Sequence, residues 1–100
     1  MTLDDYTASL KNDAPLPGLP ATLQALWHEA RGDWESAHKI VQAENSAEAA
    51  WVHAYLHRKE GDAANAAYWY RRSKRPVSTD TLENEWRSIA RDLLADSKIG

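Results

Sequence analysis

The chain has 100 residues, a formal net charge of −3 and no cysteine. This length corresponds to a single domain over 1–100, and the lack of cysteine excludes disulfides and thiolate chemistry. The acidic balance argues against a protein built mainly to hold nucleic acid, and no apolar run approaches the ~20 residues of a membrane span, so we expect neither a nucleic-acid nor a membrane partner.

The N-terminal segment, 1–19, predicts a short helix followed by a proline-rich connector. Thr2 can cap a helix whose apolar side carries Tyr6 and Leu10. The connector, NDAPLPGLP over 12–20, contains three prolines and one glycine, which disfavour regular structure. The first residues are acidic and polar where a secretory signal would be basic and then apolar, so we expect a cytoplasmic protein.

Residues 20–44 have the pattern of a helical hairpin. Leu23, Leu26 and Trp27 recur at helical spacing, and Gly32-Asp33 then ends the first helix. The second helix, behind a cap at Asp33, places its apolar residues on one face: Trp34, Ala37, Ile40 and Val41.

Residues 46–75 predict a second hairpin, which begins near a cap at Asn45-Ser46 and turns at Gly61-Asp62. The apolar arc of its first arm consists of Trp51, Val52, Ala54, Tyr55 and Leu56. His53 and His57 fall opposite this arc, so we expect both histidines outside the main core.

The second arm of this hairpin also has one apolar side, formed by Ala63, Ala66, Ala67, Trp69 and Tyr70. Because antiparallel arms must face each other to bury such sides, we expect four aromatic residues at the centre of the core: Trp51, Tyr55, Trp69 and Tyr70. Tyr68 lies on the other side of its helix and should be partly exposed.

The last predicted element is an amphipathic helix over 79–96. Ser78 to Asp80 offers N-terminal caps, and an apolar stripe follows at Leu82, Trp86, Ile89 and Leu93. The helix should cover the open side of the two hairpins, because the outer face of an end repeat needs a cap. The predicted fold is therefore all-α: two antiparallel helical hairpins with a C-terminal capping helix and a short N-terminal helix.

An internal repeat links the two hairpins. Gly32-Asp33 recurs as Gly61-Asp62, an offset of 61 − 32 = 29 residues, and His28 then aligns with His57. The segments GDWESAHKIV and GDAANAAYWY resemble the Gly-Asp turn of the tetratricopeptide-like family of helical hairpin repeats. The offset is shorter than the ~34-residue period of that family.

The resemblance implies a non-enzymatic interaction module that binds a protein or peptide partner, self-association included, with no cofactor. The residues that we expect at the binding surface are His57, Arg58, Tyr68, Arg72 and Arg75. Basic residues beside an aromatic one suit an anionic partner, although cations are also favoured at a helix C-terminus without any partner.

A metal- or small-ligand-binding protein is the alternative, and a metal-dependent enzyme is one form that it could take. His53 and His57 lie one helical turn apart, and repeat symmetry could bring His28 close to them, which would create an open site of three imidazoles. The sequence contains no Ser/His/Asp order, phosphate-cradling glycine loop or nucleophile motif, so the prediction leans against an enzyme.

Overall fold

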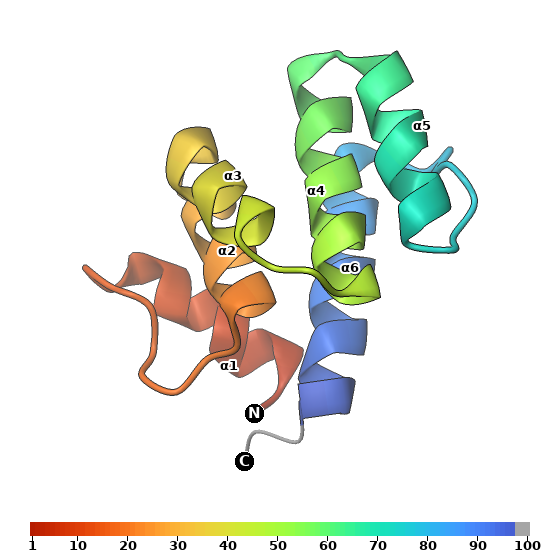
Figure 1. Ribbon diagram of the computed structural model, residues 1–100. Coiled ribbons are helices and arrows are strands. Elements are labelled where there is room, and N and C mark those ends of the chain that lie inside the picture. The colour runs from red at the N-terminus through yellow and green to blue at the C-terminus, as the bar shows by residue number, and fades with distance from the viewer. Residues whose placement is uncertain (98–100) are drawn as a thin grey trace.

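The computed structural model describes residues 1–97, which contain seven helical segments and no strand (Figure 1). They are α1 (Leu3–Ala8), the 3-10 helix η1 (Ser9–Lys11), α2 (Ala21–Ala30), α3 (Trp34–Gln42), α4 (Ala47–Glu60), α5 (Ala63–Arg72) and α6 (Leu82–Ser97). This architecture confirms the predicted all-α fold. None of these helices is long and apolar enough to cross a membrane.

The N-terminal helices are anchored to α2 by buried aromatic side chains. Thr2 caps α1 by accepting a hydrogen bond from the Asp5 N–H at 3.0 Å, and Tyr6 behind it is fully buried. The Tyr6 hydroxyl donates to the Leu23 carbonyl, and Trp27 Nε1 donates to the Ser9 carbonyl at 3.2 Å. The segment that we predicted as a short helix is therefore part of the core.

The two hairpins use the same turn. Gly32 and Gly61 adopt left-handed backbone with φ of 86° and 91°, a conformation that a side chain would strain. The next residue accepts from the first turn of the following helix: Asp33 from the Ser36 N–H and Asp62 from the Asn65 N–H. The predicted turns and caps are thus confirmed, and Ser46 caps α4 in the same way.

Helix α4 is the centre of the domain. It packs against α2, α3, α5 and α6, and every residue from Ala49 to His57 is buried. His53 is 4% exposed and His57 is 7% exposed, so the prediction that they lie outside the main core is wrong. A single apolar arc describes a helix with one solvent face, and α4 has none along this stretch.

The predicted aromatic centre is mostly confirmed. Trp51, Tyr55 and Tyr70 are buried, and Tyr68 is 42% exposed, as we expected. Trp69 is the exception, because it is only half-buried and its ring lies against a histidine of α4.

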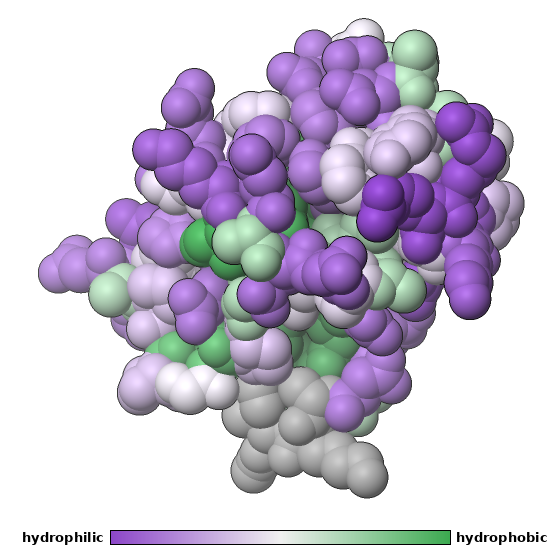
Figure 2. Space-filling model, in the orientation of Figure 1, coloured by the Kyte–Doolittle hydropathy of each residue, from purple (hydrophilic) through white to green (hydrophobic). Residues whose placement is uncertain are grey.

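Helix α6 covers the hairpins and the N-terminal segment. It contacts α1, α2 and α4, and the stripe residues Trp86, Ile89 and Leu93 are buried. Its cap is Thr81, whose hydroxyl accepts from the Asn84 N–H at 3.1 Å, and not a residue of the predicted segment 78–80. On the face seen in Figure 2, hydrophilic side chains predominate, with apolar ones in small areas.

Candidate metal centre

Three histidines meet between α3 and α4. His38 comes from α3, while His53 and His57 lie one turn apart on α4. One ring nitrogen from each lies within 4.8 Å of the others, and the Nε2 atoms of His38 and His53 are 3.1 Å apart. The ring centroids are separated by 4.7 to 5.3 Å. We call these residues the histidine cluster.

Two tryptophans hold the histidine cluster from both sides. Trp34 stacks on His38 with ring centroids 4.8 Å apart, and its Nε1 donates to the Leu56 carbonyl at 2.8 Å. Trp69 stacks on His53 at 3.8 Å. These flat contacts restrict the rotation of both imidazoles, so the rings are oriented before any ligand arrives.

A carboxylate orients the third ring. Glu60 Oε2 lies 2.5 Å from Nδ1 of His57, in the last turn of α4. Because an ionised carboxylate can only accept, Nδ1 carries a proton, and Nε2 is the nitrogen of His57 that a metal ion would bind. Metal-ligating histidines are commonly held by such a carboxylate, which fixes the tautomer and increases the basicity of the ring.

Two of the three histidines, His38 and His53, have environments that favour the uncharged ring. Burial lowers the pKa of His53 to about 4, and the nearby His38 and His57 add to this effect. The pKa of His38 is also lowered, first by burial and then by His57. His38 and His53 share a hydrogen bond between their Nε2 atoms, so one of these atoms carries a proton. Since a ligating nitrogen must be deprotonated, that ring would have to carry its proton on Nδ1 to bind a metal, with no net loss of a proton from the neutral pair.

The trio that we predicted from the sequence contained the wrong third histidine. His28 lies half-buried on α2, where its ring meets the edge of Trp27 at 5.2 Å, and it is not part of the cluster. Repeat symmetry relates His28 to His57 as residues of corresponding helices in different hairpins, and although α2 and α4 are in contact, this relation does not bring the two side chains together. The order of the helices could have identified His38 as the third residue, because α3 directly precedes α4 and packs against it.

The remaining predicted site residues are distributed over several places. Arg58 donates to the buried Glu85 at 2.7 Å, so its charge is already paired. Arg72 donates to the Tyr68 hydroxyl at 3.0 Å on the surface of α5. The Arg75 guanidinium lies over the Trp51 ring at 3.9 Å. Of the five residues predicted at the binding surface, only Tyr68 and Arg72 share a side-chain hydrogen bond or ring contact with each other.

No known protein-family model matches the chain, and neither a curated protein nor a solved structure matches it significantly. The chemistry of the site is therefore argued from its geometry. Three imidazoles that converge, with no fourth protein ligand in their group among the described residues 1–97, have the composition of an open zinc site. His57, Glu60 and Asp62 form a second, more exposed group of possible ligands beside the cluster.

Proposed function

We propose that this domain binds a divalent transition-metal ion, zinc being the first choice, through His38, His53 and His57. The observation that carries the proposal is the convergence of three ring nitrogens within 4.8 Å. A tetrahedral zinc with bonds of ~2.0–2.1 Å holds its nitrogen ligands about 3.3 Å apart. The 3.1 Å between the Nε2 atoms of His38 and His53 is close to that spacing.

The surroundings of the histidine cluster support the same function. Glu60 occupies the position that an orienting carboxylate takes in metal sites, and burial keeps His53 neutral. Since the ligands come from α3 and α4, a bound ion would link the first hairpin to the second. The fourth coordination position would be open to water or to a small molecule on the side of the half-buried His38.

Calorimetric titration of the metal-free full-length protein with zinc tests this proposal. We expect one ion per chain and a rise in melting temperature, because a ligand that binds only the folded state stabilises it by about 2.7 kcal/mol at a free concentration of 100 Kd. His38→Ala should abolish stoichiometric binding. The same titration with copper and nickel ranks the metals, since imidazole also suits these ions.

His28→Ala is the matched control, because His28 is a half-buried histidine, like His38, but lies outside the histidine cluster. This variant should bind zinc as the wild type does. Absence of binding by the wild type, or equal weakening by the His28 and His38 substitutions, would exclude the proposed site.

A second candidate function is that of an interaction module for a protein or peptide partner. The specific observation is the exposed Tyr68, whose hydroxyl accepts from Arg72 and whose ring lies 5.8 Å from that guanidinium. The resemblance to tetratricopeptide-like repeats also favours this function. We propose that the protein acts in the cytoplasm. Arg72 forms no ion pair within residues 1–97, so an acidic peptide is the partner class that fits its charge.

Fluorescence anisotropy with a labelled oligoglutamate peptide tests this second function, and sedimentation velocity tests self-association. Combined substitution of Tyr68→Ala and Arg72→Gln should weaken either form of binding. If the wild type is monomeric and does not bind the peptide, this candidate is rejected, whereas the zinc experiment is unaffected.

A further inference from the structure

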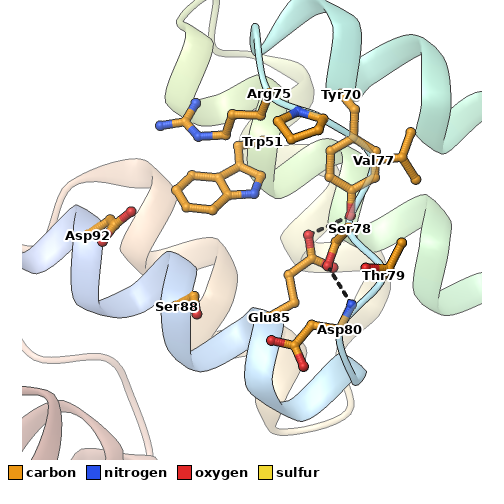
Figure 3. Close-up of a pocket in the computed structure, with 11 residues that line it drawn as sticks. Trp51, Tyr70, Arg75, Val77, Ser78, Thr79, Asp80, Glu85, Ser88 and Asp92 are labelled. Atoms are coloured by element: carbon orange, nitrogen blue, oxygen red, sulfur yellow. Dashed lines mark hydrogen bonds between the residues drawn. The ribbon is translucent and has the colours of Figure 1, made fainter.

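A cleft of about 460 Å³ lies on the other side of α4, away from the histidine cluster. It is bounded by α4, the end of α5, the connecting segment 75–80 and α6 (Figure 3). Its volume is within the range of small-molecule sites, and Trp51 and Tyr70 supply aromatic surface. Hydroxyl groups come from Ser78, Thr79 and Ser88.

Four charged residues line this cleft, and two of them already have partners. Asp80 accepts from the Thr81 N–H at 2.9 Å and the Asn84 side-chain amide at 3.2 Å, so it is engaged at the start of α6. Glu85 accepts from Arg58 at 2.7 Å and from the Tyr70 hydroxyl at 2.5 Å. Both carboxylates therefore serve the fold.

The other two charged residues, Arg75 and Asp92, form no ion pair with any residue in 1–97. Arg75 is nevertheless held in place, since its guanidinium lies over the Trp51 ring at 3.9 Å and its Nη1 donates to the Ser73 carbonyl at 3.1 Å. In the view of Figure 3, the Arg75 guanidinium lies above the left end of the Trp51 indole, and Asp92 lies to the left of the same ring. The cleft thus presents one unpaired cation and one unpaired anion beside an aromatic surface.

We propose that this cleft binds a zwitterionic small molecule of the amino-acid class, with an apolar side chain. The ligand carboxylate pairs with Arg75, which can present two parallel N–H donors, and the ligand ammonium pairs with Asp92. The apolar side chain lies against Trp51 and Tyr70 inside the cleft. A simple anion would meet Asp92 as a like charge and a simple cation would meet Arg75, so a ligand that carries both charges suits the cleft best. This proposal is independent of the metal site.

Three probes of the same shape separate the two charge contacts. L-phenylalanine has both charged groups, hydrocinnamate lacks the ammonium, and phenethylamine lacks the carboxylate. Calorimetry or chemical-shift titration of the full-length protein should rank L-phenylalanine first by about tenfold or more, because a charge-assisted hydrogen bond contributes at least that factor.

Two substitutions should then give crossed results. Arg75→Gln should weaken the binding of L-phenylalanine and hydrocinnamate about tenfold and leave phenethylamine unchanged. Asp92→Asn should weaken L-phenylalanine and phenethylamine and leave hydrocinnamate unchanged. Melting curves establish that both variants are folded, and Arg71→Gln and Asp96→Asn are controls because both residues are exposed and neither lines the cleft.

The crossed pattern supports a zwitterion site. Hydrocinnamate that binds as tightly as L-phenylalanine, together with L-phenylalanine binding that Asp92→Asn does not weaken, would overturn the proposal in favour of a simple anion site. Failure of L-phenylalanine to bind at millimolar concentration would also overturn it, as would an equal effect of the cleft and control substitutions.

Discussion

The two sides of α4 bury ionisable groups in opposite ways. On one side, His53 and His57 are buried beside His38 without a cation or a buried carboxylate between them, and burial favours neutral His53. On the other side, the buried Glu85 has an arginine and a tyrosine hydroxyl as donors. Burial raises the pKa of Tyr70, and its hydrogen bond to Glu85 adds to the effect, so this hydroxyl keeps its proton and donates.

This difference indicates which side is chemically available. A buried carboxylate with two donors has its charge compensated and acts as a structural link between α6, α4 and α5. Neutral imidazoles keep lone pairs that a metal ion can use. The histidine cluster is therefore the candidate reactive site of the core, while the Glu85 side leaves only Arg75 and Asp92 for a ligand.

The largest expected effect comes from removing the partner of Glu85. Arg58→Ala leaves a carboxylate that is 4% exposed without its cation, and breaking such a pair typically costs about 3 to 5 kcal/mol. Chemical denaturation should show a decrease of this order in the free energy of unfolding. Lys59→Ala is a nearby comparison, because Lys59 pairs with the buried Glu29 from a more exposed position and its loss should cost less.

Acid should destabilise the histidine side by a smaller amount. The pKa of His53 is about 4 in the folded protein and about 6.5 in the unfolded chain, so the unfolded state binds the proton first as the pH falls. The free energy of unfolding should therefore decrease between pH 6.5 and 4, with His53 contributing about 2 to 3 kcal/mol, and its contribution should level off below pH 4.

Denaturation of the metal-free protein at several pH values measures this dependence. His53→Leu should flatten the profile between pH 6.5 and 4, whereas His28→Leu should keep the wild-type slope. Parallel profiles for the wild type and the His53 variant would mean that His53 does not contribute to the pH dependence of stability, and this would contradict its lowered pKa in the folded protein.

Glu60→Gln should change metal affinity more than stability. Its carboxylate is bound to His57 Nδ1, and loss of such an orienting partner typically weakens metal binding by about 10- to 100-fold. Competition with a chelator of known zinc affinity measures the change. Glu48→Gln is the control, because Glu48 lies on the same helix and is not part of the histidine cluster. An equal loss of zinc affinity in both variants would contradict the role of Glu60.

The smallest effect is expected at Tyr68. This side chain is 42% exposed, so Tyr68→Ala should change the free energy of unfolding by less than about 0.5 kcal/mol. Trp69→Ala should cost more, because Trp69 is half-buried and stacks on His53 at 3.8 Å. Thermal melts of the two variants compare these neighbours directly, and a larger loss for Tyr68 would reverse the assignment of the faces of α5.

Local signals were sufficient for most of the secondary structure. The left-handed glycines at 32 and 61, with a capping aspartate after each, define both hairpin turns without reference to the rest of the chain. The stripe of α6 and the exposure of Tyr68 also follow from helical periodicity. Local signals did not identify the cap of α6, because several consecutive residues in 78–81 can accept from a helix N-terminus and the structure uses Thr81.

The sequence by itself determined the two hairpin turns, the approximate extent of most helices and which residues face the core on helices with one buried side. Only the tertiary structure decided that α4 is surrounded by four helices, and this burial brought His53 and His57 into contact with His38. The physical reason is that periodicity describes one helix at a time, whereas the number of helices that pack around it depends on the whole chain. The histidine cluster and the cleft lined by Arg75 and Asp92 both arise from that packing, because each combines side chains from different helices.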